Sequence, residues 1–437
     1  MVLYRGMVYE TSYQKRLLDG LEDGINETRK TKRLDIRKVI TAVDNIGRKL
    51  AAGVYTEKIR ELGMEGLEKQ LEEILPMMTR EAMEHKLSVE LGDLEKNALL
   101  TGRTTLRSGN LASYICPLGT LFHIAAGNRQ GLPVFSVIEG LLTGNINILK
   151  LPQADGGLSL EILKELIKTE PEVADFIYVF DTPSSDLDAM KKMAEMSDGI
   201  VVWGGEEAVS AVRTFAPAGA KIIEWGHKLS FAYFSDWEKL GKDALIREMT
   251  ALAEHIVSTK QLLCSSCQVI YLDTEDEKRT DLFCRVFLPI LDKAAAKYPP
   301  QSVGMRAELN LRRYCDELNS VILEENVYEK KIYQGKRCSL TLNSDNRLEL
   351  SELFGNCLVK QLPRENMMQV LRRQKGYLQT AGLVCPEKER ETLSGMLADC
   401  GIVRVTKAGS MSKTFPGEAH DGEYPLRRYI RSVDVEK

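Results

Sequence analysis

The sequence contains no uninterrupted apolar run of the roughly 18 residues that a membrane-spanning helix needs. It also lacks an excess of one charge, since 59 Lys and Arg stand against 63 Asp and Glu for a net charge of −4. A nearly neutral chain gives no reason to expect nucleic acid or an anionic membrane as a partner. The first residues, Met1–Met7, lack the apolar centre of a signal peptide. We therefore expect a cytoplasmic protein without a membrane span.

Two common nucleotide-binding signatures are also missing. No G-x-G-x-x-G and no G-x-x-x-x-G-K-[ST] occurs in the chain. A bound nucleotide would therefore need another arrangement of binding residues.

The sequence has few signs of a metal site or a disulfide framework. Its five histidines show no paired ligand spacing, and Cys264 and Cys267 form the single C-x-x-C. A lone C-x-x-C is a weak signal, so no metal site is expected. A metal-binding or scaffold role for this pair remains an alternative, as does a redox dithiol. Nine cysteines, an odd number in a long chain, do not indicate structural disulfides.

The composition indicates an ordinary globular protein. The 437 residues are 43% hydrophobic and 28% charged, and this length is enough for two or three domains. Within residues 1–110, apolar residues recur at three-to-four spacing, as in Ile36, Val39, Ile40 and Val43. This pattern predicts a helical amino-terminal part that packs on the next domain.

Between residues 111 and 225, short apolar runs alternate with amphipathic segments. Strands are predicted at 114–126, 146–151, 176–180, 199–203 and 221–224, with helices at 134–142, 158–168, 186–196 and 206–215. This alternation predicts a parallel sheet covered by helices on both faces. Ligands of such sheets bind at the carboxyl ends of the strands.

The pattern of residues 226–400 predicts a second α/β domain. Its strands are expected at 231–234, 269–272, 338–342 and 357–359, and its helices at 239–257, 282–297 and 308–323. Residues 401–437 form a β-like tail. The expected fold class is thus α/β, with two parallel-sheet domains.

The stretch Lys260–Gln268 is the strongest candidate for chemistry. It places Cys264 before two small hydroxyl residues, and a strand-like run follows at 269–272. A cysteine on a loop that enters a strand is suited to be an exposed nucleophile, and only its thiolate attacks. The alternative is a cysteine that packs as a small hydrophobe, as most cysteines do. Cys267, three residues later, is a competing choice for the nucleophile.

Several motifs occur in an order that resembles the aldehyde dehydrogenase superfamily, most closely the bacterial bioluminescence-type acyl-CoA (fatty-acyl) reductases. The resemblance covers roughly residues 110–437. It is carried by Gly127-Asn128, Thr143–Asn145, Lys150–Pro152, Glu224–Ser230, Lys260–Gln268, Glu352–Gly355 and the tail segments His420–Leu426 and Arg431–Asp434. It implies an aldehyde-dehydrogenase-like fold with an active site in the cleft between the two α/β domains.

The resemblance implies a role for each candidate catalytic residue. Cys264 would attack an acyl thioester, release CoA or another carrier, and form an acyl-cysteine that hydride reduces to the aldehyde. Asn128 and the backbone N–H of Cys264 would stabilise the oxyanion. Glu224 would position groups or move a proton. CoA would be a co-substrate or product.

The resemblance also implies a nicotinamide site. Lys150 would contact the adenosine ribose or its phosphate, Gly204 and Gly205 would lie by the nicotinamide-side phosphates, and Glu352 and Phe354 would contact the nicotinamide ribose and ring. Gln153 stands where many NAD-specific relatives carry an acid, which favours NADP(H) over NAD(H), although Asp155 is close by.

The residues leave alternatives to this activity open. The same site could oxidise an aldehyde with CoA, or the chain could be a relative that binds or transfers acyl groups without redox chemistry. The resemblance implies a homodimer or larger homo-oligomer formed through the tail, and an acyl-donor enzyme as a further partner. The length of the acyl chain is not readable from the sequence.

Overall fold

The computed structural model describes residues 1–63, 74–92, 106–108, 110–125, 131–152, 155–298, 330–415 and 417–436, with a few single residues between 304 and 318. The chain forms two compact units. Unit 1 comprises Met1–Gly226 and Thr414–Lys437, and unit 2 comprises His227–Lys413. The tail therefore returns to the unit that contains the amino terminus.

Unit 1 is built on a sheet of seven strands. In spatial order they are β2 (Met7–Tyr9), β1 (Val2–Tyr4), β7 (Ile177–Phe180), β6 (Ile146–Lys150), β5 (Thr120–Ile124), β8 (Gly199–Trp203) and β9 (Lys221–Trp225). The five strands β7, β6, β5, β8 and β9 are parallel, whereas β1 and β2 add to the edge as an antiparallel hairpin. The sequence pattern did not predict this hairpin, because its two strands have only three residues each.

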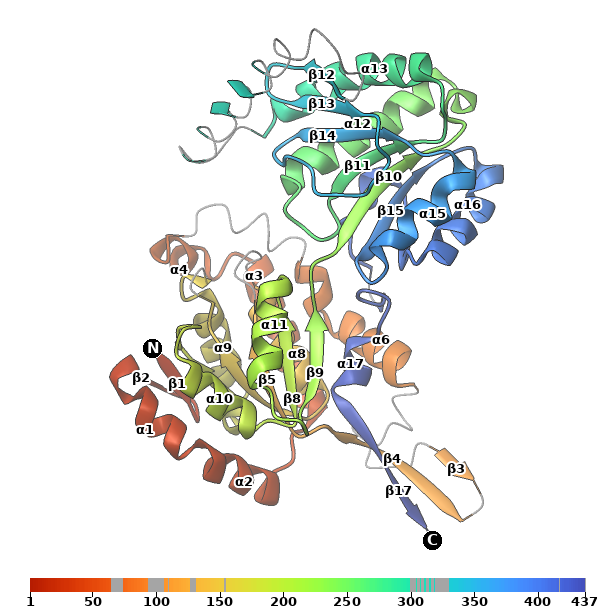
Figure 1. Ribbon diagram of the computed structural model, residues 1–437. Helices are drawn as coiled ribbons and strands as arrows, with labels where there is room; N and C mark the ends of the chain where they lie inside the picture. Colours follow the sequence, from red (N-terminus) through yellow and green to blue (C-terminus); the bar gives the residue numbers. More distant parts are fainter. Residues whose placement is uncertain are drawn as a thin grey trace. The chain divides into compact units, whose positions relative to one another are not determined.

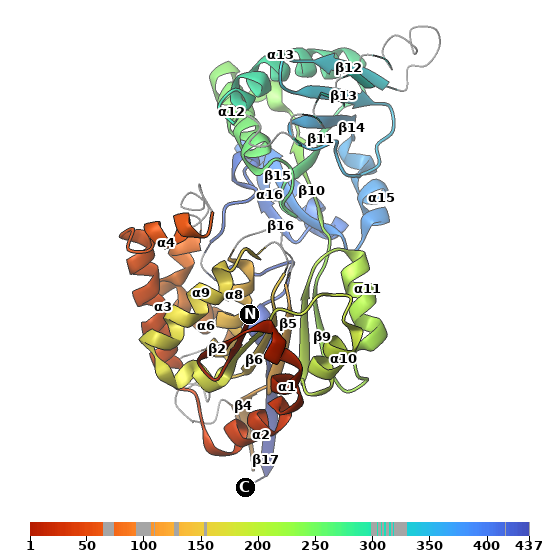
Figure 2. The ribbon, with the colours of Figure 1, turned by 90° about the vertical axis from the view of Figure 1, so that its left-hand side faces the viewer.

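Helices cover both faces of this sheet (Figures 1 and 2). α3 (Ile36–Ala51), α8 (Leu132–Leu142) and α9 (Leu158–Thr169) contact one another in one layer, and α10 (Leu187–Glu195) and α11 (Glu206–Phe215) form the other. The other helices among the described residues of the amino-terminal part are α1 (Gln14–Asp19), α2 (Leu21–Thr31), α4 (Thr56–Glu61) and α6 (Arg80–Leu91). Right-handed crossovers explain the two layers, because the chain moves outward from β5 to β7 and then back to β8.

The reversal of strand order between β5 and β8 creates a topological switch point. Carboxyl ends of strands at such a point border a crevice in which ligands bind. β8 ends at Trp203, directly before Gly204 and Gly205. Residues 126–130, which follow β5 and include Asn128, lie outside the described residues.

The tail pairs with a separate strand of unit 1. β17 (Ile430–Glu436) lies antiparallel to β4 (Leu111–Pro117), which also pairs with β3 (Leu106–Ser108), as Figure 1 shows. The short helix α17 (Pro425–Arg428) precedes β17. Its backbone N–H at Leu426 donates to the buried Glu90 carboxylate at 2.7 Å, and Asn145 Nδ2 donates to the carbonyl of Tyr429 at 2.9 Å. These buried bonds fix the start of the tail on unit 1.

Unit 2 is built on a second seven-stranded sheet. Its spatial order is β12 (Lys330–Gln334), β13 (Ser339–Asn343), β14 (Asn356–Gln361), β11 (Cys267–Leu272), β10 (Leu229–Phe234), β15 (Leu378–Val384) and β16 (Arg404–Thr406). Only β12 is antiparallel to its neighbour in this sheet. Within the part of unit 2 that the structure describes, the α-helices are α12 (Lys242–Thr259), α13 (Glu277–Ala295), α15 (Met367–Leu371) and α16 (Glu387–Cys400).

Two helix predictions for unit 2 have specific outcomes. α13 begins at Glu277, five residues before the predicted start at 282, because the Asp276 side chain accepts the N–H groups of Lys278 and Arg279 and caps the helix. The predicted helix 308–323 falls mostly outside the described residues.

Strand periodicity divides the core of unit 2 into two layers. Phe234, Ile270 and Leu272 pack with α12 and α13, whereas their neighbours Tyr233 and Tyr271 pack with α15 and α16. Successive side chains of a strand point to opposite faces, so a sheet buried on both faces needs apolar residues at every position. This burial makes the sheet a rigid platform for the loops at its two ends.

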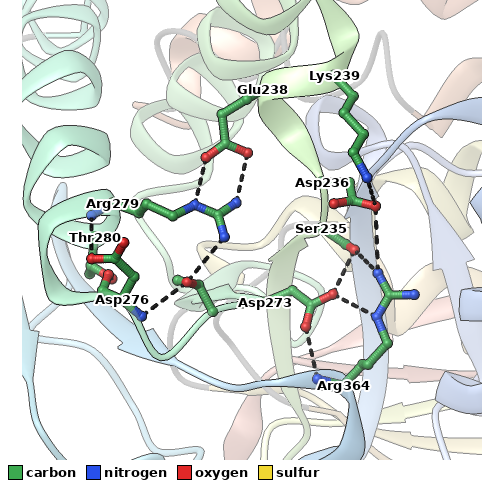
Figure 3. Close-up of polar contacts among 10 residues, drawn as sticks. Ser235, Asp236, Glu238, Lys239, Asp273, Asp276, Arg279, Thr280 and Arg364 are labelled. Atoms are coloured by element: carbon green, nitrogen blue, oxygen red, sulfur yellow. Dashed lines mark hydrogen bonds and ion pairs between the residues drawn. The ribbon is translucent and has the colours of Figure 1, made fainter.

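Charged side chains hold the carboxyl ends of β10 and β11 (Figure 3). Arg364 Nε donates to Asp273 at 2.9 Å, and a terminal nitrogen of Arg364 donates to Ser235 Oγ at 2.7 Å. Ser235 in turn donates to Asp273 at 2.7 Å. Nearby, Arg279 binds Glu238 through two bonds of 2.8 Å. The arginines in this network are therefore bound by carboxylates of the protein itself.

Candidate active site

The Cys264 loop lies at the opposite, amino end of the unit 2 sheet. It joins the end of α12, at Thr259, to the start of β11, at Cys267. Leu263 N–H donates to Ser266 Oγ at 3.0 Å, and Ser266 N–H donates to the Leu263 carbonyl at 2.9 Å. This reciprocal pair closes a tight turn around Cys264, whose side chain is exposed.

Two serine contacts attach this turn to the rest of unit 2. The fully buried Ser230 of β10 donates from Oγ to the Cys264 carbonyl at 2.7 Å and accepts the N–H of Thr380 at 3.1 Å. Ser265 Oγ and Ser412 Oγ are 2.7 Å apart. The backbone on both sides of Cys264 is thus fixed while the residue itself is exposed, as an attacking group requires.

Cys267 occupies a very different environment from Cys264. Its side chain is buried among core residues that pack against α12, and its Sγ contacts the Val269 carbonyl at 3.4 Å. Burial raises the pKa of Cys267 to about 12. A thiol in this environment stays protonated near neutral pH, so the geometry disfavours Cys267 as the nucleophile.

The segment Ser351–Gly355, which contains Glu352 and Phe354, lies beside the Cys264 loop. The N–H of Phe354 donates to the Lys260 carbonyl at 3.2 Å. Leu353 and Phe354 have φ of +63° and +52°, and Lys260 and Gln261 have φ of +53° and +61°. Left-handed backbone costs a non-glycine residue on the order of 1–3 kcal/mol, so the surrounding contacts must enforce these conformations. The structure therefore brings Cys264, Glu352 and Phe354 together through two strained backbone segments.

Two buried glutamines, Gln261 and Gln268, lie between the loop and the turn, and neither is among the site residues predicted from the sequence. Each hydrogen-bonds to Ser351. Both residues are within the stretch Lys260–Gln268, but a glutamine is a common surface residue. Only their burial identifies them as part of the site.

In unit 1, Lys150 is the last residue of β6 and is largely buried. Its Nζ donates to Ser184 Oγ, 3.0 Å away, just beyond the carboxyl end of β7. Desolvation lowers the pKa of Lys150, and the nearby Asp181 carboxylate opposes that shift. Lys150, Gly204 and Gly205 thus share the edge of the sheet at which α/β proteins bind ligands.

The Gly204-Gly205 segment leads into α11. A Cβ atom at Gly204 would lie only 2.8 Å from the Ala208 side chain, so glycine allows the tight turn there. The first turn of α11 carries Glu206 and Glu207. These carboxylates already interact favourably with the positive end of the helix dipole, so the dipole adds little attraction for a phosphate there.

Glu224, in β9, binds Arg213 of α11 through two hydrogen bonds of 2.7 and 2.9 Å. Both residues line a surface pocket of about 520 Å³ together with Ile222, Glu423 and Arg428. The Glu224 carboxylate is therefore already bound by a guanidinium of unit 1.

Two residues from the sequence predictions cannot be placed. Asn128 and Gln153 lie outside the described residues. Asp155, the acid that left the cofactor preference in doubt, is buried and accepts hydrogen bonds from the N–H and the hydroxyl of Ser159 in α9. Its carboxylate is therefore already bound within unit 1.

Two other features are absent from the described residues, a metal site and a membrane-spanning helix. No three His, Cys, Asp or Glu side chains there are grouped so that they could hold a metal ion. Likewise, none of the described helices has the length and apolar character to cross a membrane.

Comparison with known proteins gives one family. The sequence profile described as "Acyl-CoA reductase (LuxC)" matches residues 32–432. Among curated proteins, the chain is 25% identical over 333 residues to a long-chain acyl-protein thioester reductase of Photorhabdus laumondii, and 23% identical over 326 residues to one of Vibrio harveyi. Each match covers 74% of this chain but only 64% and 65% of the relatives' lengths.

Solved structures agree in fold. A glyceraldehyde-3-phosphate dehydrogenase of Methanocaldococcus jannaschii, complexed with NADP, aligns with a TM-score of 0.67 at 14% identity over 99% of this chain and 96% of its own. Aldehyde dehydrogenase 21 of Physcomitrella patens aligns with a TM-score of 0.68 at 12% identity over 96% of this chain and 90% of its own. The expected aldehyde-dehydrogenase-like fold with two α/β sheets is thus confirmed.

Proposed function

This chain belongs to the LuxC family of acyl-CoA reductases, and we propose that it reduces a long-chain acyl thioester to an aldehyde through an acyl-cysteine on Cys264. The observation that carries the proposal is the contrast between the exposed Cys264 and the buried Cys267. The acyl donor would be acyl-CoA or an acylated carrier protein, since the relatives carry both kinds of thioester in their names.

The covalent step is a thioester exchange. The Cys264 thiolate attacks the acyl carbon, the bond to the carrier sulfur breaks, and the carrier leaves as its thiolate. The Cys264 N–H and the Asn128 amide are the proposed donors to the oxyanion, and the loss of one such donor typically lowers the rate by about 10²–10³. Ser230 holds the Cys264 carbonyl, so it also fixes the orientation of this loop.

The residues of unit 1 fit a phosphorylated nicotinamide cofactor. Lys150 supplies a cation at the carboxyl end of β6, and the Asp155 carboxylate is bound to Ser159. The engagement of Asp155 with Ser159 favours NADP(H) over NAD(H), although the Asp181 carboxylate also lies near Lys150. When bound, the nicotinamide supplies the hydride that converts the acyl-cysteine into the aldehyde and restores the Cys264 thiolate.

The other proposed contacts to the cofactor are those of Gly204, Gly205, Glu352 and Phe354. Gly204 and Gly205 would allow close approach of the backbone to the nicotinamide-side phosphates. Glu352 would bind the nicotinamide ribose, with Phe354 near the ring. Glu224 would move a proton or position groups once its pair with Arg213 opens.

An oligomer is also part of the proposal. β17 is an edge strand of the sheet β17-β4-β3, and most of its side chains are exposed. An edge strand of this length offers unpaired backbone groups for a strand from a second copy. Light scattering of the full chain and of a variant truncated before Ile430 would test this assignment.

Intact-mass measurements test the acylation step. The protein is mixed with a long-chain acyl-CoA without NADPH, and an acyl adduct is expected on wild-type protein and on Cys267→Ala but not on Cys264→Ala. Cys267→Ala is the matched control because it removes a thiol from the same loop. An adduct that survives in Cys264→Ala and is lost in Cys267→Ala would reverse the assignment.

Adding NADPH tests the redox step. We expect the adduct to disappear while the nicotinamide absorbance falls and free aldehyde forms. A stable adduct without nicotinamide oxidation would favour acyl transfer instead. Replacing Lys150 with Gln should raise KM for NADPH more than KM for NADH, and equal effects would argue against a phosphate contact at Lys150.

A further inference from the structure

The side-chain amide of Gln261 bridges the Cys264 loop and the turn that contains Glu352. Its Nε2 donates to the Cys267 carbonyl at 3.0 Å and to Ser351 Oγ at 2.9 Å, and its Oε1 accepts the N–H of Gly355 at 2.9 Å. Both amide hydrogens are used, and an exchanged orientation would set an N–H against the Gly355 N–H. The amide is only 1% exposed, so water cannot replace these bonds.

Gln268, the second residue of β11, makes the complementary set of contacts. Its Nε2 donates to the main-chain carbonyl of Gln261 at 2.8 Å. Its Oε1 accepts both the N–H and the hydroxyl of Ser351, at 3.1 and 2.8 Å. Ser351 Oγ also accepts the N–H of Leu353 at 3.2 Å. Gln261, Gln268 and Ser351 therefore form one buried, fully connected network, called here the amide clamp.

The clamp acts where the backbone is strained. Of the seven non-glycine residues with positive φ in the described part of the chain, four are Lys260, Gln261, Leu353 and Phe354. Gln261 and Gln268 bond directly to the two segments that contain these residues, and Phe354 N–H joins the segments to each other. Strained backbone persists only where surrounding contacts impose it.

We propose that Gln261 and Gln268 are positioning residues that set the geometry of the Cys264 loop and of the Glu352 turn together. The inference rests on the proposed function, in which Cys264 accepts the acyl group and Glu352 binds the nicotinamide ribose. Because one network holds both segments, its loss displaces both of them. Acylation of Cys264 and binding of the cofactor then weaken in parallel, although neither glutamine touches either ligand.

Conservative substitutions separate the bonds of the clamp. Gln261→Glu keeps the acceptor for Gly355 N–H but loses the donors to Cys267 and Ser351. Gln268→Glu keeps both bonds from Ser351 and loses only the donor to Gln261. Gln261→Met and Gln268→Met remove the amides without adding charge. These two variants therefore show the effect of losing the hydrogen bonds without a change in charge.

Gln361 provides the matched control. It lies at the other end of the same sheet, where its Nε2 donates to Thr280 Oγ1 at 3.0 Å. Gln361→Met removes a glutamine hydrogen bond from β14 but leaves the clamp intact. It reports how much of any change comes from a general loss of stability.

The experiment measures three quantities for each variant well below its Tm. They are the single-turnover rate of acyl-adduct formation without cofactor, the Kd for NADPH, and hydrogen exchange in peptides covering 260–266 and 351–356. For Gln261→Met and Gln268→Met we expect acylation at least fivefold slower, Kd at least fivefold weaker, and faster exchange in both peptides. Gln361→Met should stay within twofold of wild type in all three, and the double clamp variant should be no worse than the more severe single variant.

The outcomes separate the two proposals. If wild-type protein forms no adduct on Cys264, the proposed function fails, and the exchange and Kd measurements still decide whether the clamp couples the two segments. If wild-type protein reacts but the clamp variants keep its acylation rate and Kd within twofold, the positioning role is wrong. Changes that match those of Gln361→Met at equal loss of Tm, or faster exchange in only one peptide, would also overturn it.

Discussion

The two ends of the unit 2 sheet are held by different chemistry. At the carboxyl end, ions dominate: Arg364 binds Asp273, and Arg279 binds Glu238 (Figure 3). At the amino end, neutral amides and hydroxyls carry the contacts, with Gln261 and Ser230 bound to the loop that presents Cys264. Both arrangements fix the backbone where parallel strands enter or leave the sheet.

The difference has a physical reason if Cys264 is the nucleophile. A full charge acts over long distances and shifts the pKa of any thiol near it, whereas an amide dipole acts at short range. A neutral clamp can therefore hold the loop without fixing the charge state of the thiol. The carboxyl end of the sheet lies away from Cys264, so full charges there are not subject to this constraint.

The largest expected effect is on stability, from Arg364→Leu. The change leaves Asp273, whose side chain is 9% exposed, without its guanidinium partner. Breaking a largely buried pair on one side should lower the free energy of unfolding by about 3–4 kcal/mol. The three tryptophans are Trp203, Trp225 and Trp237, so urea titration of Trp237 fluorescence in a W203F/W225F background reports on unit 2.

The same variant tests whether the two ends are independent. The acylation rate of Cys264 per folded molecule should stay within twofold of wild type, while Arg364→Lys, which keeps the charge, should lose less stability than Arg364→Leu. A large fall in acylation below the unfolding transition would mean that the charged end also positions the nucleophile.

The second prediction concerns acid and His255, at the amino end. His255 is buried in α12, its Nε2 accepts the N–H of Cys267 at 3.4 Å, and burial, with a smaller effect of Arg404, lowers its pKa from 6.5 to about 4. Above pH 6.5 the ring is neutral in both the folded and unfolded chain. Between 6.5 and 4 only the unfolded chain takes up the proton, so stability falls by about 2–3 kcal/mol as the pH is lowered.

His255→Gln keeps an acceptor but does not titrate, so it should remove this part of the pH dependence in unit 2. The charged end responds in a lower range, because the bond from Lys239 holds the pKa of Asp236 below 3.8 and its contribution is lost only as the pH falls through that lowered value. His123→Gln, at a buried histidine of unit 1, is the control. Hydrogen exchange of β11 between pH 4 and 7 measures the effect, and an unchanged profile in His255→Gln would contradict it.

Much of the fold could be predicted from local pattern. The strands from β6 to β11 were found because each is a short apolar run bounded by a change to helical periodicity. The edge hairpin of β1 and β2 was missed because three-residue strands leave too little pattern, and β15 was missed although all seven of its residues are buried. In β15, Gln379, Thr380 and Gly382 interrupt the apolar run by which the other fully buried strands could be recognised.

The candidate site residues could be predicted only where they belong to a recognisable sequence motif. Cys264 could be chosen from its neighbours, but its contrast with Cys267 depends on which way each side chain points at the start of β11. The role of Gln261 and Gln268 could not be predicted from the sequence, because their partner Ser351 is more than 80 residues away along the chain. Such long-range hydrogen bonds become visible only once the strands are placed.

The smallest expected effect belongs to the pair Glu238 and Arg279, at the outer part of the charged network. The pair has ideal bidentate geometry, and the guanidinium lies 4.8 Å from the centre of the Trp237 ring, but the two side chains are 47% and 38% exposed. Water and salt screen such a pair, so a double-mutant cycle with Glu238→Gln and Arg279→Met should give a coupling of only about 0.5–1 kcal/mol. The coupling should shrink further in 1 M salt, whereas the loss in Gln261→Met should not change with salt because the clamp contains no ions. A salt-dependent loss in Gln261→Met would show that charge also acts at the amino end, and the distinction between the two ends would fail.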